Sequence, residues 1–227
     1  MTASTLDGFA AVLFDLDGTL VDTAPDMVAV LQGLQDDHGL APVSYDFGRA
    51  HVSNGALGLL RIAFPQADEA LRESLLCEYV ARYAQRLCQE TVLFAGLDDL
   101  LLQLEKAGRP WGVVTNKPEH LTLPLLEELA LAQRISCAVS GDTLPKKKPD
   151  PEPLLHACDL AGVEPTETLY IGDAERDIDA GRRAGMATVA AAYGYIAPGD
   201  DPGRWGADAV VADTLELTHL LRKAVNL

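Results

Sequence analysis

Two carboxylates that could do chemistry, Asp15 and Asp17, stand two residues apart at the end of the apolar run Ala10–Phe14. Along an extended strand, side chains two residues apart point to the same side, so we expect both acids to face one site. Two acids at this spacing repel each other unless a cation joins them, and Mg²⁺ prefers such hard oxygen ligands. The pair therefore predicts a magnesium site with Asp15 and Asp17 as ligands.

The same two acids suit the transfer of a phosphoryl group. The carboxylate of Asp15 can attack phosphorus and become an acyl phosphate, which divides one difficult displacement into two easier ones. Asp17 can protonate the leaving alcohol and later take a proton from the hydrolytic water. Gly18 lets the chain turn close to the phosphate, and Thr19 offers a hydroxyl group. Asp15 is our candidate nucleophile, and Asp17 is our candidate general acid and base.

A second candidate segment follows the apolar run Trp111–Val114. Thr115 would end this strand, and Asn116 follows it where a helix opens. A hydroxyl group at a strand end, together with the N–H groups of a helix N-terminus, can hold a phosphate. A plain helix cap is the alternative interpretation of these residues. We predict Thr115 and Asn116 as substrate-binding residues.

Three consecutive lysines, Lys146–Lys148, are unusual in a chain with a net charge of −16. One ammonium group near Asp15 would offset the charges of the nucleophile and the phosphate. Without the other motifs, a solvated surface run would be the favoured interpretation.

Two further carboxylates follow the apolar run Leu169–Ile171. Asp173 would end a strand, and Asp177 would lie one turn into the next helix. This spacing keeps both side chains on one side, so that one can bind a cation directly while the other lies beside it.

These groups need elements that position them, and the chain predicts an α/β fold. Short apolar runs alternate with amphipathic stretches, as in a parallel sheet covered by helices, and ligands bind beyond the carboxyl ends of such strands. The predicted strands are Ala10–Phe14, Pro110–Thr115, Ile135–Val139, Thr168–Ile171, Ala187–Ala192 and Ala209–Val211. The predicted helices between them are Gly96–Ala107, Glu119–Leu129, Glu152–Ala161 and Ala174–Ala184.

One stretch, from Thr23 to Thr91, breaks the alternation because it shows helical periodicity and no convincing buried strand. We interpret it as a separate small helical domain. Its predicted helices are Asp26–Asp37, Ala56–Phe64 and Asp68–Leu87. The loop His51–Ala56 is the expected lid, and Ser53 and Asn54 in it are candidate substrate-binding residues.

The segment Asp15-Leu-Asp-Gly-Thr-Leu-Val-Asp22-Thr-Ala-Pro resembles the first motif of the haloacid dehalogenase-like superfamily, in its phosphoglycolate phosphatase-like branch. The resemblance extends from about Phe9 to Val211. It implies a Rossmann-like parallel sheet core, residues 1–22 and 92–227, and a mobile helical cap domain, residues 23–91.

The resemblance also implies roles by position. Thr115 would bind a phosphoryl oxygen. Lys148 matches the lysine of the family's K-P-x-P motif and would stabilise charge. Asp173 and Asp177 match the motif G-D-x-x-x-D, in which the first acid would bind Mg²⁺ directly and the second would act as an outer or water-mediated ligand.

The implied activity is a Mg²⁺-dependent phosphatase that hydrolyses a small phosphomonoester through an aspartyl-phosphate on Asp15. Dehalogenase members lack an acid at the position of Asp17, because a halide leaving group needs no proton. Phosphonate hydrolysis is excluded because residues 23–91 contain no lysine for a Schiff base. A sugar phosphomutase of the same superfamily and a non-catalytic relative that binds a phosphorylated ligand stay open as alternatives.

Segments outside these motifs bear on the substrate. Thr115-Asn-Lys-Pro with Tyr193-Gly-Tyr resembles phosphoglycolate phosphatases, whereas Trp111–Pro118 with Trp205-Gly-Ala-Asp resembles the N-acetylmuramic acid 6-phosphate phosphatases of bacterial cell-wall recycling. Kinship alone does not fix a substrate. Arg49 and Arg61 are candidates to pair with a substrate carboxylate.

The composition limits the partners. The acidic surface would repel nucleic acid and anionic membranes, and the chain has no run of eighteen apolar residues. Four cysteines without metal-site spacing indicate free thiols in a reducing cytoplasm, and Met1–Phe9 lacks the basic cluster of a secretory signal. We expect a cytoplasmic monomer or homodimer that acts on a small phosphorylated metabolite and has no nucleic-acid or membrane partner.

Overall fold

The computed structural model describes residues 6–227 and contains a six-stranded parallel sheet with the order β5-β4-β1-β6-β7-β8. The chain places β4 and β5 on one side of β1 and then returns to add β6, β7 and β8 on the other side. Ligands of such doubly wound sheets bind beyond the carboxyl ends of the strands, where the order reverses. The strands are β1 (Ala11–Phe14), β4 (Trp111–Val114), β5 (Cys137–Val139), β6 (Thr168–Gly172), β7 (Ala187–Ala191) and β8 (Ala209–Val211). The predicted α/β fold and all six predicted strands are confirmed.

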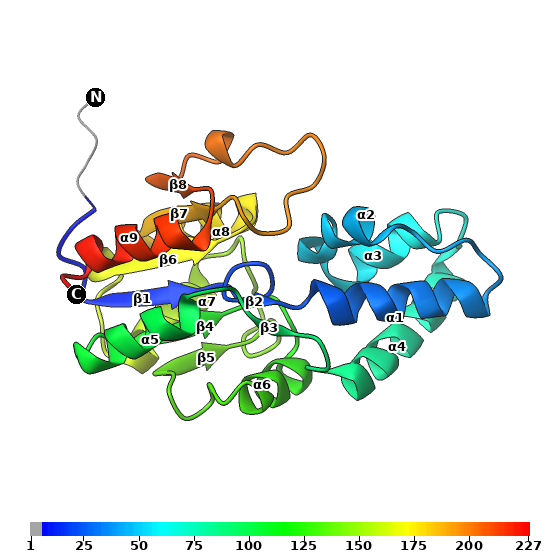
Figure 1. Ribbon diagram of the computed structural model, residues 1–227, viewed down its shortest axis with the longest axis horizontal. Helices are drawn as coiled ribbons and strands as arrows, with labels where there is room; N and C mark the ends of the chain where they lie inside the picture. Colours follow the sequence, from blue (N-terminus) through cyan, green and yellow to red (C-terminus); the bar gives the residue numbers. More distant parts are fainter. Residues whose placement is uncertain (1–5) are drawn as a thin grey trace.

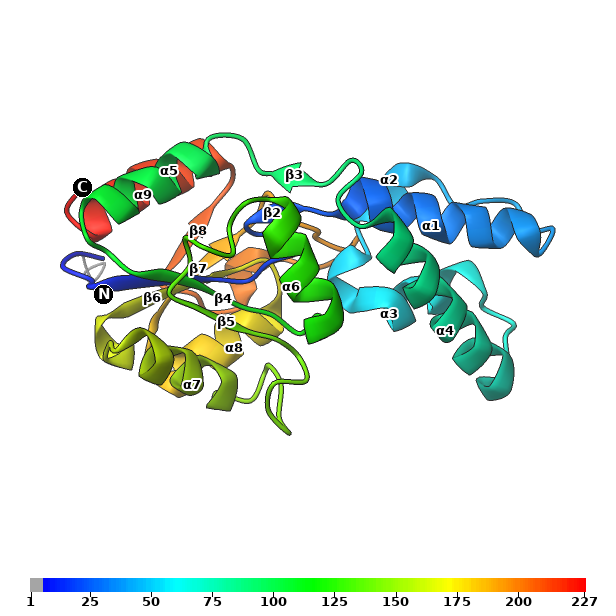
Figure 2. The same cartoon turned by 90° about the horizontal axis from the view of Figure 1, so that it is seen from below.

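Helices cover both faces of this sheet. Figure 2 shows α5 (Leu97–Lys106) and α9 (Thr214–Ala224) on one face, and α7 (Glu152–Ala161) and α8 (Glu175–Ala184) on the other. All residues of β1 are buried, and alternate side chains serve the two layers. Phe14 packs with the leucines of α5, while Leu13 packs with Leu154 and Ala157 of α7. This burial on both faces explains why β1 is a continuous apolar run.

A group of helices lies beyond the end of the sheet to which β1 points (Figure 1). They share an apolar cluster that includes Leu31, Leu59 and Tyr79. A short antiparallel ladder between β2 (Val21–Asp22) and β3 (Val92–Leu93) joins the segments that lead into and out of this group. We refer to the group as the cap; the domain limits at residues 23 and 91 stay a prediction. Its helices are α1 (Ala24–Asp37), α2 (Tyr45–Arg49), α3 (Gly55–Ala63) and α4 (Glu69–Arg86), and the remaining helix of the core is α6 (Glu119–Glu128).

Asp26 connects the start of the cap to the segment that leaves it. Its side chain is fully buried, and Oδ2 accepts hydrogen bonds of 2.8–3.0 Å from the N–H groups of Glu90 and Thr91 and from the Thr91 hydroxyl. Its Oδ1 lies 3.1 Å from Nε of Arg86. One carboxylate therefore holds together the two chain segments that join the cap to the core.

We expect Asp26→Ala to lower the free energy of unfolding by about 2–3 kcal/mol, because buried N–H donors lose their acceptor. Urea unfolding measures this change. Asp36→Ala removes an exposed carboxylate from the same helix and should change stability by less than about 0.5 kcal/mol. Equal stability of the two variants would contradict the role given to Asp26.

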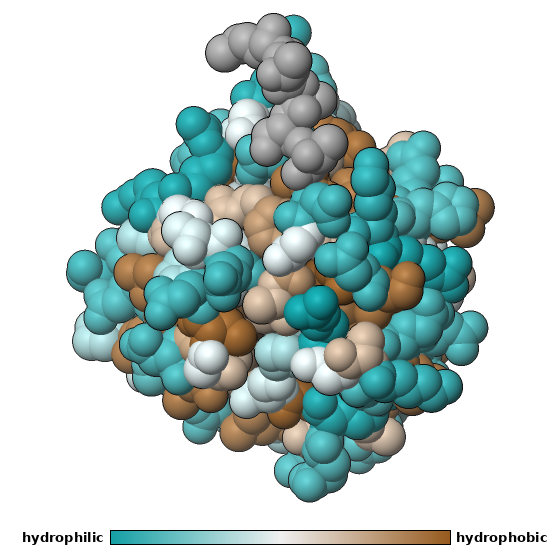
Figure 3. Space-filling model, turned by 90° about the vertical axis from the view of Figure 1, so that its left-hand side faces the viewer, coloured by the Kyte–Doolittle hydropathy of each residue, from teal (hydrophilic) through white to brown (hydrophobic). Residues whose placement is uncertain are grey.

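The surface away from the cap is mixed in character. At that end of the molecule, hydrophilic residues surround smaller groups of hydrophobic ones (Figure 3). Within residues 6–227, no helix combines the length and the apolar character needed to cross a membrane. The segment Met1–Phe9 is not expected to be a secretory signal, and its first five residues, Met1–Thr5, lie outside the described residues.

Candidate active site

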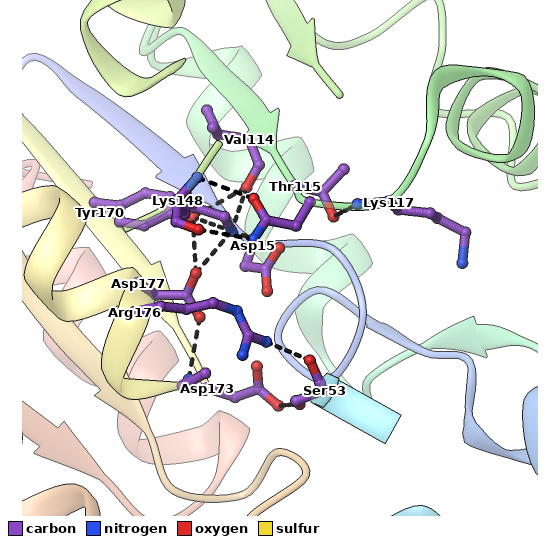
Figure 4. A network of polar contacts seen from close by, with 12 residues as sticks. Asp15, Ser53, Val114, Thr115, Lys117, Lys148, Tyr170, Asp173, Arg176 and Asp177 are labelled. Atoms are coloured by element: carbon purple, nitrogen blue, oxygen red, sulfur yellow. Dashed lines mark hydrogen bonds and ion pairs between the residues drawn. The ribbon is translucent and has the colours of Figure 1, made fainter. Parts of the chain in front are cut away.

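Three carboxylates gather at the carboxyl ends of β1 and β6. Asp15 directly follows β1, Asp173 directly follows β6, and Asp177 lies in the first turn of α8. All three are buried, and each offers an oxygen within 4.8 Å of the others (Figure 4). The structure therefore brings these three predicted metal ligands together.

The donor set of this cluster fits a divalent cation. Oδ1 of Asp173 is buried and has no hydrogen-bond donor among the described residues. Burial raises the pKa of Asp15 to about 6, although Lys148 opposes the shift. Burial and the charge of Asp15 raise the pKa of Asp173 to about 8. A hard divalent cation such as Mg²⁺ would favour the ionised form of both acids.

Lys148 is buried among these acids, as its predicted role requires. Its Nζ lies 2.9 Å from Oδ1 of Asp15 and 2.7 Å from Oδ1 of Asp177. It also donates hydrogen bonds to the hydroxyl of Tyr170 and to the carbonyl of Val114. Burial acts to lower the pKa of this lysine, but the two carboxylates raise it above its ordinary value. The ammonium is therefore charged beside the candidate nucleophile.

Asp177 differs from the other two acids because protein donors already occupy both of its oxygens. Oδ1 pairs with Lys148, and Oδ2 accepts a 3.1 Å hydrogen bond from the N–H of Ala174. Asp173, in contrast, keeps an oxygen without a donor. The geometry suits Asp173 as a direct ligand and Asp177 as an outer one.

Asp17 has a separate set of partners. Its Oδ1 accepts a 2.7 Å hydrogen bond from the hydroxyl of Thr23 and lies 2.9 Å from Nζ of Lys117. The carboxylate stays partly exposed, with 16% of its side chain accessible. Asp17 is therefore held at the core–cap boundary in contact with solvent.

The side-chain cluster contains Asp15, Asp173 and Asp177 but not Asp17, so the two acids do not face one side as expected, and metal ligation by Asp17 stays a prediction. The reason is local. The chain turns immediately after Asp15, and the carbonyl of Leu16 accepts hydrogen bonds from the N–H groups of Leu20 and Val21. Side chains two residues apart share a side only along an extended strand.

Lys117 received no role from the sequence, yet it is buried between core and cap. Its Nζ lies 3.0 Å from the hydroxyl of Tyr83 in α4 and 4.6 Å from the centre of that ring. Burial acts to lower the pKa of Lys117, but the charge of Asp17 opposes this effect, and the net result is a pKa above the ordinary value of a lysine. Its place beside Thr115 and Asn116 at a strand end is the signal that could have identified it.

Gly18 is required by the close packing of the site. Its φ of +84° lies in the left-handed region, and an added Cβ would lie 2.1 Å from Oδ2 of Asp173. Only glycine combines this conformation with this approach. The sharp turn predicted after Asp17 is therefore present, and it packs against a metal-ligand candidate.

Thr115 and Asn116 follow β4 at the same edge of the sheet. Oγ1 of Thr115 is buried and accepts a hydrogen bond from the N–H of Lys117. The Asn116 amide donates to the carbonyl of Lys148 at 3.0 Å and accepts from its N–H at 3.1 Å. Asn116 thus holds the backbone of Lys148, because an amide side chain matches the donor and acceptor of a peptide unit. Substrate binding by Asn116 stays a prediction.

A cavity of about 270 Å³ lies where the cap meets the core. Ser53 donates a 2.7 Å hydrogen bond to Oδ2 of Asp173, and Arg176 donates to the carbonyl of Ser53. Ser53 therefore contacts a core carboxylate as well as lining this cavity, and Arg176 is a cavity residue that the sequence did not indicate. The lining residues are Ser53, Asn54, Asp173, Ala174, Glu175, Arg176, Tyr195, Ala197 and Asp200.

The two arginines proposed for a substrate carboxylate are not among the residues that line this cavity. Arg49 lies over the ring of Tyr195 at 4.9 Å and donates to the carbonyl of Gly194 at 3.3 Å. Arg61 is exposed on α3. Among the described residues that line the cavity, Arg176 carries the cationic side chain.

Comparison with known proteins gives consistent matches. The model of the haloacid dehalogenase-like hydrolase family matches residues 12–191. The N-acetylmuramic acid 6-phosphate phosphatase of Pseudomonas aeruginosa is 44% identical over 216 residues, 95% of this chain and 96% of that protein. The phosphoglycolate phosphatase of Xanthomonas campestris pv. campestris is 46% identical over 207 residues, 91% of this chain and 94% of that protein.

A solved structure shows the same fold. The crystal structure of a predicted phosphoglycolate phosphatase from Haemophilus somnus 129PT aligns with a TM-score of 0.83 and 27% identity, covering 94% of this chain and 98% of that one. The chain belongs to the haloacid dehalogenase-like hydrolase family.

Proposed function

We propose that this hydrolase is a Mg²⁺-dependent phosphatase that cleaves a small phosphomonoester through an aspartyl-phosphate on Asp15. The observation that supports this most is the setting of Asp15 itself. It is a buried carboxylate at a strand end, 2.9 Å from a buried ammonium and beside an acid with an unsatisfied oxygen. Nucleophile, counter-charge and metal ligands are what phosphoryl transfer requires.

In the first step, a carboxylate oxygen of Asp15 attacks phosphorus, and the bond from phosphorus to the leaving oxygen breaks. Asp17, in its protonated form, gives its proton to that oxygen, so that the alcohol leaves neutral. Lys148 stabilises the charge spread over the transferring group, and Thr115 at the end of β4 holds a phosphoryl oxygen.

In the second step, water attacks phosphorus while Asp17 takes up its proton. The bond between phosphorus and Asp15 breaks, which frees phosphate and restores the carboxylate. Mg²⁺ bound by Asp15 and Asp173, with Asp177 in an outer position, would supply positive charge against the phosphoryl oxygens.

The substrate we propose carries a carboxylate and is N-acetylmuramic acid 6-phosphate or 2-phosphoglycolate. One relative named for each of these substrates matches more than nine-tenths of the chain. Both compounds are carboxylic acids, and Arg176 is the one cationic side chain among the described residues that line the cavity. The cavity of about 270 Å³ suits a small metabolite. We further propose that the enzyme acts in the cytoplasm, as a monomer or homodimer.

Phosphate release from matched esters, with Mg²⁺ and with chelator, tests this function. N-acetylmuramic acid 6-phosphate is paired with N-acetylglucosamine 6-phosphate, which lacks the lactyl group and its carboxylate. 2-Phosphoglycolate is paired with 2-hydroxyethyl phosphate, in which a hydroxymethyl group replaces the carboxylate. We expect Mg²⁺-dependent release, faster by at least about tenfold for the carboxylated member of one pair. Isomerised sugar phosphate without release would indicate a mutase, and no turnover of any ester would contradict the proposal.

Asp17→Asn should separate the proton donor from the other groups. We expect kcat for an alkyl phosphate to fall by about 10²–10⁴-fold, because the alkoxide then leaves without a proton. p-Nitrophenyl phosphate should lose much less, since its leaving group is stable as an anion. Steady-state rates on both esters measure this difference, and equal losses would show that Asp17 does not protonate the leaving group.

A further inference from the structure

We propose that Ser53 of the cap is a positioning residue of the metal site, so that cap docking and divalent-cation binding strengthen each other. The inference rests on the metal site proposed above. It concerns a cap hydroxyl that the sequence had indicated only as a substrate contact.

The two oxygens of Asp173 have opposite environments. Oδ2 accepts a 2.7 Å hydrogen bond from Oγ of Ser53 and a 2.8 Å hydrogen bond from the N–H of Tyr195. Oδ1 is buried and has no donor within residues 6–227. Figure 4 shows Ser53 at one oxygen while the other points toward Asp15. The two donors thus fix the carboxylate in the orientation that leaves Oδ1 for a cation.

The two donors come from different parts of the molecule. Tyr195 belongs to the core and follows β7, whereas Ser53 lies in the short turn Val52–Asn54 between α2 and α3 of the cap. Val52 is buried in the apolar cluster of the cap, which holds this turn in place. One of the two hydrogen bonds that orient Asp173 therefore exists only while the cap is docked.

A second contact acts on the same residue. Arg176, which directly precedes Asp177 in sequence, donates a hydrogen bond to the carbonyl of Ser53. Ser53 is thus held through its hydroxyl and its carbonyl by two residues of the segment that supplies two metal ligands.

Such outer partners matter for metal affinity. Hydrogen bonds that orient a ligating carboxylate typically change metal affinity by about 10–100-fold when they are removed. Coupling between two binding events is reciprocal, so a cation that is bound more tightly with the cap docked must also hold the cap more tightly.

Titration calorimetry of Mg²⁺ into the full chain, without substrate, tests the inference. Ser53→Ala should raise the dissociation constant for Mg²⁺ by about tenfold, because one of the two hydrogen bonds that orient Asp173 is lost. Ser53→Thr keeps the hydroxyl and should restore affinity to within about threefold of wild type. Ser74→Ala removes an exposed cap hydroxyl on α4 and should leave the affinity unchanged.

Hydrogen exchange of the Val52–Asn54 amides supplies the reciprocal measurement. Mg²⁺ should slow this exchange in wild type and much less in Ser53→Ala. A Ser53→Ala affinity within about twofold of wild type, an equal loss in Ser53→Thr, or exchange that does not respond to Mg²⁺ would each overturn the inference. Because no substrate is present, these failures would leave the phosphatase proposal standing, whereas no Mg²⁺ binding by wild type would overturn both.

Discussion

Asp15→Asn should abolish turnover, with kcat reduced by at least about 10⁴-fold, as expected when a covalent nucleophile is removed. The asparagine amide nearly matches the carboxylate in shape, so the packing at the end of β1 should persist. It lacks the negative charge that attacks phosphorus and that pairs with Lys148 at 2.9 Å. Single-turnover phosphate release, with ester and Mg²⁺ in excess of their dissociation constants, measures the chemical step.

Asp179→Asn is a suitable control because it makes the same change at an exposed acid of α8. It should keep wild-type activity. The unfolding transitions of both variants show whether any loss of activity reflects loss of structure. Activity of Asp15→Asn above about 1% of wild type would contradict its role as nucleophile, because the loss would then be far below that of a missing covalent step.

Lys148→Met should damage both activity and stability. The ammonium compensates buried Asp15 and Asp177 at 2.9 and 2.7 Å. Removing one partner of a buried charge network costs about 3–5 kcal/mol, since the remaining charges are left unpaired. Loss of this preorganised charge should also lower kcat by about 10²–10³-fold.

Lys147→Met provides the matched control, because Lys147 is the exposed neighbour of Lys148 in the same lysine run. It should leave both kcat and the free energy of unfolding close to wild type. Urea unfolding in chelator and steady-state kinetics in Mg²⁺ measure the two effects separately. Similar behaviour of the two methionine variants would show that Lys148 is not the lysine that compensates the acids.

Much of the sheet could be predicted because local pattern and burial agree. The strands β1 and β6 are buried along their whole length, and each contains an uncharged, mainly apolar run that is followed by an acid. Three of the elements that were not predicted are too short to carry such a pattern. The strands β2 and β3 have two residues each, and α2 has five including Gly48. For α9, the buried residues Leu217 and Leu221 form a helical stripe that the sequence did contain.

The site was predictable where a motif alone sets the geometry, and not where tertiary contacts set it. Asp173 and Asp177 meet because a strand passes directly into a helix. The direction of Asp17 depends on a tight turn and on Lys117, which is 100 residues away in sequence. Asn116 contacts Lys148, a pairing 32 residues apart that no local spacing indicates.

Trapping of the phosphorylated enzyme tests the central claim most directly. Enzyme mixed with Mg²⁺ and a turned-over ester is quenched in acid, treated with borohydride and digested, and the peptides are sequenced by mass spectrometry. Borohydride reduces an acyl phosphate to an alcohol, so we predict homoserine at position 15, absent when substrate is omitted. Unmodified Asp15 under conditions of rapid turnover, or reduction at a different acid, would contradict a covalent intermediate on Asp15.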